Sequence, residues 1–228
     1  MTRSSYEEEI GEIRRMLLEM GSRVDVMVSQ AMDALTRQDT LLVEQILAND
    51  DAIDDLDVRI ESECMRLIAL QQPIARDLRV IGTAMKVITD LERIGDHAVD
   101  IAKVARKLAV HSFYKPLVDL PRMATIVHQM LHDALAAFVN HDLDLVKQVV
   151  ASDDAVDDLF HNIREELHET MQRDSRLVVQ ASYLLFVAHY LERIADHIVN
   201  IAERVHFVET NTLTNLAKNQ KIALNSAA

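Results

Sequence analysis

The sequence predicts an all-α protein built from two tandem, homologous three-helix bundles, with six long helices related by a pseudo-two-fold axis. First, the 228 residues include only four glycines and three prolines, too few for the many turns of a β-rich fold. Second, apolar residues recur at three- and four-residue steps over long stretches, as on one face of a helix. Third, the segment 90–102 returns at 190–202 with nine of 13 positions identical. Repetition on this scale indicates two copies of one helical unit.

Composition and charge narrow the classes of function. The chain is 49% hydrophobic and 4% aromatic, so its core must be aliphatic and rich in methionine. A formal net charge of −13 disfavours nucleic acid and anionic membranes as main partners, because both require a basic surface. Cys64 is the single cysteine, which favours a reducing compartment and predicts a cytoplasmic protein. The uncharged run from Leu177 to Leu191 is too short and too polar for a transmembrane helix.

The first repeat is expected to contain three helices. A methionine-containing stripe predicts the first over about 6–35, and its methionines are interpreted as core residues. Asp39 is a plausible N-cap for the second, which continues to about residue 70. A second capping pattern at Asn49–Asp50 predicts a kink or restart there. Pro73 marks the turn into the third helix, which runs to about residue 107.

The same pattern then begins again after a linker. Asp142 repeats the cap at Asp39, and 48–56 returns as 151–159 with seven of nine positions identical. The offset falls from 103 to 100 residues before the last helix, which places a deletion at the turn around 173–175, where Asp174 or Ser175 can cap the sixth helix. The predicted organisation is a first bundle over 1–112, a linker over 113–121, a second bundle over 122–209 and a frayed tail over 210–228.

Helical geometry brings acidic residues of neighbouring helices together. At about 100° per residue, one flank of the second helix carries Asp50, Asp54 and Asp57, while Asp51 and Asp55 face solvent. The corresponding row of the third helix is Glu92, Asp96 and Asp100. Folding the two helices back at residue 73 places Asp50 level with Asp96, and Asp54 level with Glu92. In the second repeat the same construction pairs these residues: Asp153 with Asp196, and Asp157 with Glu192. There Asp154 and Asp158 are expected on the solvated side.

Four clustered carboxylates predict a cation site in each repeat. Two unit charges about 4 Å apart repel by about 1 kcal/mol in water and about 4 kcal/mol at an effective dielectric of 20. Oxygen ligands suit hard cations such as Mg²⁺, Mn²⁺ and Ca²⁺, or iron. His189 and His161 add nitrogen only to the second repeat, which favours a transition metal there. The competing interpretation is a solvated face whose charge is neutralised by Arg93 and Arg193, or favoured by a helix dipole at residues 50–55.

These features resemble the PhoU family of phosphate-signalling regulators over about residues 8–209. The resemblance rests on the motifs L-E-R-I-G-D-H and L-E-R-I-A-D-H, on the two D-x-x-x-D segments and on the tandem layout. It implies a helical protein with acidic motifs that bind multinuclear metal clusters, with Mg, Mn, Fe or Zn as the candidate ions. Carried over by position, the metal ligands are Asp50, Asp54, Glu92, Asp96, Asp100, Asp153, Asp157, Glu192 and Asp196, to which geometry adds His189. Asn200 departs from the acidic pattern of Asp100, so fewer or weaker ions are expected in the second site.

The resemblance also implies a function and partners. Members act with a phosphate ABC transporter and a sensor histidine kinase, and repress the phosphate-starvation response when phosphate is plentiful. The expected protein is a non-enzymatic, homodimeric regulator that contacts the transporter ATPase and the kinase. Two alternatives remain open. One is a ferritin-like di-metal enzyme, for which Glu165-x-x-His168 is half of a paired motif. The other is a metal-free helical scaffold whose acids only increase solubility.

Overall fold

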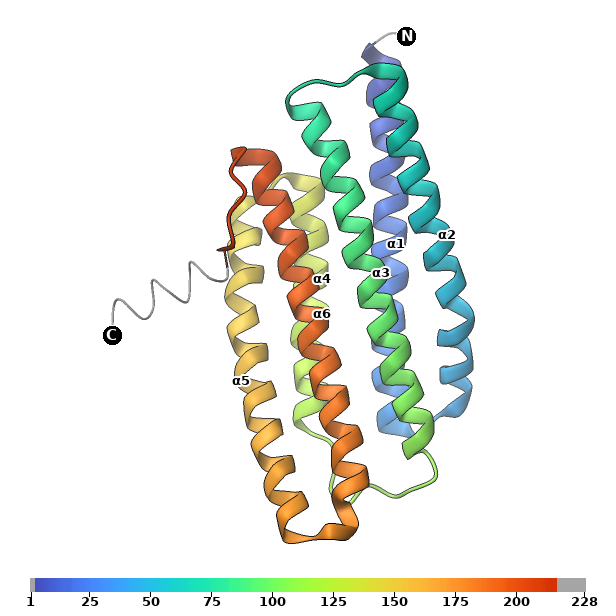
Figure 1. The fold of residues 1–228 in the computed structure, drawn as a ribbon, viewed down its shortest axis with the longest axis vertical. Coiled ribbons are helices and arrows are strands. Elements are labelled where there is room, and N and C mark those ends of the chain that lie inside the picture. The colour runs from blue at the N-terminus through green and yellow to red at the C-terminus, as the bar shows by residue number, and fades with distance from the viewer. Residues whose placement is uncertain (1–2, 217–228) are drawn as a thin grey trace, which may run out of the picture.

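Long helices make up nearly all of the described chain. The computed structural model describes residues 3–216, and the part of the predicted tail beyond residue 216 lies outside them. A short 3-10 helix, η1 (Ser175–Leu177), leads into the last helix. The helices, shown in Figure 1, are α1 (Arg3–Arg37), α2 (Thr40–Gln71), α3 (Arg76–Leu108), α4 (Asp119–Asn140), α5 (Leu143–Arg173) and α6 (Val178–Thr210).

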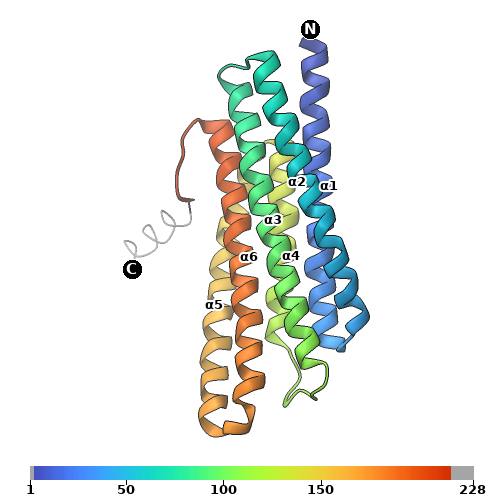
Figure 2. The same ribbon diagram turned by 45° about the vertical axis from the view of Figure 1, so that its right-hand side comes forward.

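The six helices form two three-helix bundles that lie side by side, which confirms the predicted fold class. In the first bundle α2 packs against α1 and α3, and in the second α5 packs against α4 and α6. The bundles meet where α3 lies antiparallel to α6, and α1 lies against α4 behind them (Figures 1 and 2). The outer helices α2 and α5 therefore each share one exposed groove with an inner helix, α3 or α6.

One continuous apolar core holds both bundles together. The methionine stripe of α1 is buried as predicted, with Met20 and Met27 completely inaccessible to solvent. Helices α3 and α6 bury many residues, since they pack against each other as well as against both other helices of their own repeats. Small residues such as Ala98 and Ala195 lie at their buried positions and permit close approach of the backbones.

The starts of α2 and α5 follow the predicted caps. The Asp39 carboxylate accepts a hydrogen bond from the Leu41 amide, and Asp142 accepts two, from Asp144 and Leu145. At the turn where the repeat offset changes, Asp174 accepts from the Arg176 amide and so caps η1. Helix α6 itself begins at Val178 after Leu177 and has no side-chain cap, so the expected cap of the sixth helix at Asp174 or Ser175 was wrong.

Two further expectations about the helices were wrong. Helix α2 runs without a break through Asn49 and Asp50, where a kink or restart was expected. Helix α4 begins at Asp119, so Pro121 lies in its first turn rather than in the linker. That position tolerates proline because the first amides of a helix have no intrahelical acceptor.

Candidate metal-binding faces

The first acidic face lies in the groove between α2 and α3. Asp50 and Glu92 are half-buried, Asp96 is also half-buried, and Asp54 is exposed. All four project from uninterrupted helices, so their spacing is fixed by the backbone. Since Asp50 and Asp54 lie in the middle of α2, the helix dipole does not explain why acids gather there.

The carboxylates of this face act on one another. Burial raises the pKa of Asp50 above its ordinary value, and the charges of Asp54 and then Asp96 raise it further. Burial likewise raises the pKa of Glu92. The charge of Asp96 raises it further, and the charge of Asp54 adds a smaller contribution. These pairs join α2 to α3 at the two heights that the sequence predicted. The four acids therefore form one repelling cluster, and Asp57 at its edge has a raised pKa from burial, Glu61 and Asp54.

Arg93 neutralises the α3 half of the cluster. Its Nη1 atom lies 2.8 Å from Asp96 Oδ2, and its Nε atom lies 3.3 Å from Glu92 Oε2. The charge of Arg93 lowers the pKa of Glu92, but the net shift remains upward. Among residues 6–216, whose side chains are described, Asp50 and Asp54 form no ion pair. The arginine therefore compensates only part of the negative charge.

Asp100 stands apart from this cluster. Its carboxylate lies 3.3 Å from Lys103 Nζ on the same helix, and its charge raises the pKa of Tyr190 on α6. Lys103 also opposes the raised pKa of Asp50. The structure thus places Asp100 toward the boundary between the repeats, and its predicted role as a ligand remains a prediction.

The second acidic face lies between α5 and α6 and is more enclosed. Asp153 is only 6% exposed, and Asp157 is half-buried. Burial raises the pKa of Glu192, the Asp196 charge raises it further, His189 and Arg193 oppose the shift, and Asp157 adds to it. Glu192 and Asp157 therefore face each other across the groove, as predicted.

The cations of the second face are a histidine and an arginine. Arg193 Nη1 lies 2.8 Å from Asp196 Oδ2, which repeats the Arg93–Asp96 pair. His189 Nδ1 lies 3.3 Å from Glu192 Oε2 without hydrogen-bond geometry, so this buried oxygen has no hydrogen-bond partner. His161 instead pairs with Glu165 on its own helix at 2.9 Å. Of the two predicted nitrogen donors, only His189 contacts the acidic face.

The outer acids divide less cleanly than expected. Asp51, Asp55 and Asp158 are exposed as predicted, but Asp154 is half-buried, so its expected place on the solvated side was wrong. Asp153 is buried and Asp154 half-buried, whereas their counterparts Asp50 and Asp51 are half-buried and exposed. The second face is therefore deeper than its sequence counterpart in the first repeat.

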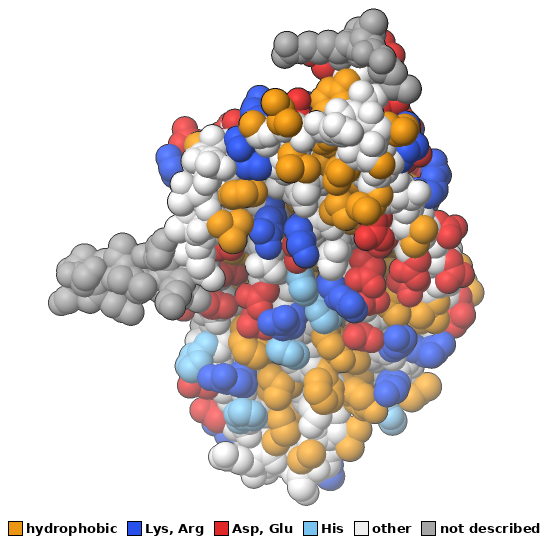
Figure 3. Space-filling model, turned by 45° about the horizontal axis from the view of Figure 1, so that its top comes forward, with side chains coloured by type: hydrophobic (Ala, Val, Ile, Leu, Met, Phe, Trp, Pro, Cys, Tyr) orange, Lys and Arg blue, Asp and Glu red, His pale blue; other side chains and the backbone are white. Residues whose placement is uncertain are grey.

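The donor chemistry fits a hard cation, but the oxygens are not gathered around one point. Carboxylates that raise each other's pKa are relieved by a bound cation. In the described part of the chain, no three His, Cys, Asp or Glu side chains lie close enough together to hold a metal ion. Binding would have to draw the acids of α2 and α3 together and displace Arg93 from Asp96. Figure 3 shows carboxylates gathered on its right-hand side, over α2, beside a band of basic and histidine side chains.

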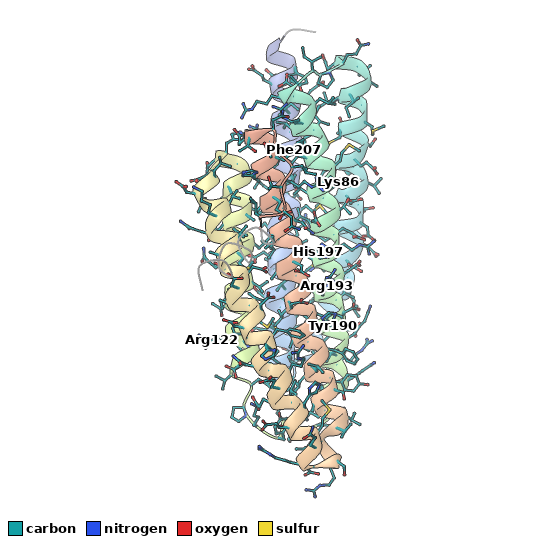
Figure 4. The ribbon with its side chains drawn as sticks, turned by 60° about the vertical axis from the view of Figure 1, so that its left-hand side comes forward. Lys86, Arg122, Tyr190, Arg193, His197 and Phe207 are labelled. Atoms are coloured by element: carbon teal, nitrogen blue, oxygen red, sulfur yellow. The ribbon has the colours of Figure 1, made fainter. Side chains whose placement is uncertain are left out.

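A histidine pair outside the predicted ligand set lies between the two repeats. His97 and His197 belong to the repeated motif, and their ring centroids lie 5.8 Å apart across the α3–α6 boundary. His197 Nδ1 lies 2.9 Å from Asp90 Oδ1, whereas His97 stacks on Tyr190, the counterpart of Asp90. Figure 4 shows Tyr190, Arg193 and His197 following one another along α6. The repeated D-H of the motif was the available signal.

His97 is half-buried and forms no ion pair with an acid among the described side chains, although the charges of Asp100 and Asp96 oppose the lowering of its pKa. Its Nδ1 atom is buried without a hydrogen bond, and burial together with His197 lowers the pKa of His97. The two histidines therefore differ: His197 contacts a carboxylate, whereas His97 has a buried Nδ1 atom without a partner and a lowered pKa.

Two further observations bear on the alternatives. Glu165 and His168 are both exposed, whereas a di-metal bundle enzyme projects its ligands inward. None of the helices described is apolar over enough of its length to span a bilayer.

The fold and its paired acidic grooves define an all-helical protein of two homologous repeats, each with one carboxylate-rich face. The family model described as "PhoU domain" matches this chain twice, over residues 17–105 and 120–205. The chain belongs to the PhoU family, which confirms the resemblance inferred from its motifs.

Relatives and solved structures agree with this assignment. The phosphate-specific transport system accessory protein PhoU homolog of Clostridium acetobutylicum is 41% identical over 217 residues, covering 95% of this chain and 99% of the relative. The corresponding homolog of Aquifex aeolicus is 39% identical, covering 82% and 84%. The crystal structure of PhoU from Pseudomonas aeruginosa superposes with a TM-score of 0.88 at 35% identity, covering 91% of this chain and all of that one. For the phosphate transport system regulatory protein PhoU from Streptococcus pneumoniae, the TM-score is 0.86 at 31% identity, covering 92% and 100%.

Proposed function

We propose that this protein is a metal-binding, cytoplasmic accessory protein of phosphate uptake that represses the phosphate-starvation response. It acts through the ATPase of a phosphate ABC transporter and through a sensor histidine kinase, and it functions as a homodimer without enzymatic activity. The observation that carries the proposal is family membership along both repeats, combined with a carboxylate cluster at the same place in each.

The acidic faces are the proposed metal sites. Asp50, Asp54, Glu92 and Asp96 hold ions in the first repeat, with Asp100 at its edge. The second set is Asp153, Asp157, Glu192, Asp196 and His189. A bound Mg²⁺, Mn²⁺, Zn²⁺ or iron ion neutralises carboxylates that otherwise repel, and it ties an outer helix to an inner one. His189 gives the second face the greater preference for a transition metal, since imidazole suits Zn and Fe.

Metal content tests the sites directly. We expect the purified wild type to bind Mn²⁺ or Fe²⁺ in calorimetry. The variant Glu92→Ala/Asp96→Ala should lose the metal ions bound by the first repeat. The variant Glu192→Ala/Asp196→Ala should lose the metal ions bound by the second repeat. The matched control is Asp51→Ala/Asp55→Ala, which removes two charges at the same spacing from the exposed side of α2. Equal metal content in the wild type and both groove variants would reject the sites.

Association tests the regulatory role separately. The full-length protein should retain the transporter ATPase and the sensor kinase in a pull-down, with a difference between high and low phosphate. Deleting the gene should switch on phosphate-starvation genes at high phosphate. A protein that binds metal yet retains neither partner would support the metal sites and contradict the regulatory proposal.

A further inference from the structure

A cationic cavity lies far from both acidic faces, at the end of the molecule where α3 ends and α6 begins. It has a volume of about 690 Å³, within the range of small-molecule sites. The walls come from three places: the last turn of α3, the linker that follows it, and η1 with the first turns of α6. This end is the lower one in Figure 1.

The charge of the cavity opposes that of the whole protein. Lys107, His111 and Arg176 line it, and none of its lining residues is acidic, in a chain of net charge −13. Lys107 forms no ion pair with any side chain of residues 6–216, and its Nζ atom lies 5.2 Å from the Tyr183 ring centroid. Arg176 is held by Asp174 at 2.7 Å, outside the lining. An uncompensated lysine in a concave site favours an anionic ligand.

Hydrogen bonds fix the part of the cavity wall that the linker forms. The Gln180 side chain accepts a hydrogen bond from the Tyr114 amide at 3.0 Å and donates one to the Ser112 carbonyl at 3.1 Å. From the other side, Gln38 donates to the carbonyls of Leu108 and His111. These amide contacts hold the linker against both repeats, so the cavity is present before any ligand binds.

One polar group in the wall lacks a partner. The Tyr114 hydroxyl is buried and makes no hydrogen bond. Tyr114 lines the cavity, and because buried polar groups in native proteins are nearly always satisfied, its orphan hydroxyl is a group that a ligand or water entering beside the ring can satisfy. Tyr114 and Tyr183 also give the cavity two aromatic rings beside its cations.

We infer that this cavity binds a nucleotide, with its phosphates at Lys107 and Arg176 and its base among the tyrosine rings. The combination of free cation, phenolic hydroxyl and aromatic wall matches a phosphorylated aromatic molecule better than an inorganic anion, which would leave the rings unused. The volume of this open cavity suits a small molecule rather than an acidic segment of another protein. This site is independent of the proposed metal faces.

Calorimetry of the full-length protein with ADP tests the inference. EDTA is included, because it prevents ADP from reaching the acidic faces through a bridging metal. We expect ADP to bind with a dissociation constant below about 1 mM, and adenosine and inorganic phosphate to bind at least about tenfold more weakly. Lys107→Gln should weaken the binding of ADP about tenfold or more, and Lys107→Arg should retain the affinity of the wild type. Lys86→Gln, the same charge change on the exposed face of α3, should have no effect.

Tyr114→Phe separates ligand binding from folding. Since the hydroxyl has no partner in the protein, its removal should leave the thermal midpoint of the free protein unchanged or higher. The same substitution should weaken ADP about three- to tenfold, the value of one hydrogen bond. The inference fails if ADP does not bind, if Lys107→Gln and Tyr114→Phe leave its affinity unchanged, or if inorganic phosphate or a pentaglutamate peptide binds as tightly.

Discussion

At the scale of single residues, the carboxylates of the acidic faces lower the stability of the folded protein. Glu92 and Glu192 are held half-buried beside other carboxylates, and both have raised pKa values because burial and neighbouring acids disfavour the charged form. Arg93 and Arg193 relieve only the α3 and α6 sides. A fold that needed these positions only for solubility would be better served by exposed acids. The repetition of this cost in both repeats is the physical argument for a cation.

Glu92→Gln should stabilise the metal-free protein at pH 7 by up to about 1 kcal/mol, since it removes one charge from a repelling cluster. A raised folded pKa gives stability that is complete below the ordinary carboxyl pKa and is lost as pH rises through the folded value. The difference in unfolding free energy between variant and wild type should therefore grow from about pH 4 toward pH 7. Urea titrations in EDTA at several pH values measure this difference.

Comparing Glu92→Gln with a matched control variant cancels the pH dependence that other titrating groups contribute to the unfolding free energy. The lowered pKa of His97 makes stability rise with pH near neutrality, and Asp174, with a pKa of about 2, contributes in acid. Asp55→Asn is the matched control, because it removes one charge from the exposed side of α2. Added Mn²⁺ should stabilise the wild type more than Glu92→Gln. A Glu92→Gln protein that is less stable than the Asp55→Asn control without metal would contradict the repulsion argument.

At the scale of helices, the sequence specified most of the fold. Apolar periodicity located all six helices, and side-chain caps at Asp39 and Asp142 fixed where two of them begin. The expected break at Asn49–Asp50 failed because the flanking Ile46 and Ile53 are buried in the core, and their burial outweighs a local capping preference of about 1 kcal/mol. Facing acids could be predicted since helical rotation is regular.

What the sequence could not provide depends on contacts between the repeats. The cavity at the linker exists because Gln38 and Gln180, distant in sequence, clamp the same segment. Helix ends were also hard to place, because His141 and Gln72 adopt left-handed conformations without the glycine that usually marks them. The side-chain directions of Arg93 and Asp96 likewise follow from packing rather than from spacing.

The caps make a prediction at this scale. Asp142→Ala should destabilise the protein by about 1 kcal/mol, and by more than Asp39→Ala, because Asp142 accepts two amide hydrogen bonds and Asp39 accepts one. Asp119→Ala serves as the control, since the N-terminus of α4 has no side-chain cap. Chemical denaturation measures all three, and an equal cost for Asp119→Ala would show that charge near a helix start, rather than capping, is responsible.

At the scale of the whole molecule, the two repeats behave as one folded body. The α3–α6 boundary contains apolar residues of both repeats, and the core continues across it. Polar contacts across the boundary are asymmetric: Asp90 holds His197 and Asn200, while the counterpart Tyr190 stacks on His97. At the opposite end from the cavity, Arg76 and His141 both pair with Glu209, which ties the repeats together a second time.

Asp90→Ala tests whether the repeats unfold together. The side chains of Asp90 and His197 are each only 15% exposed, so the change leaves a largely buried histidine and Asn200 without their acceptor. We expect a loss of about 1–3 kcal/mol, and a single thermal transition at a lower midpoint, because both halves share one core. Hydrogen exchange should then report the same loss of protection at Ile60 in the first repeat and at Ile163 in the second. Two resolved transitions, or a loss confined to one repeat, would show instead that the halves are independent bundles that only touch at α3 and α6.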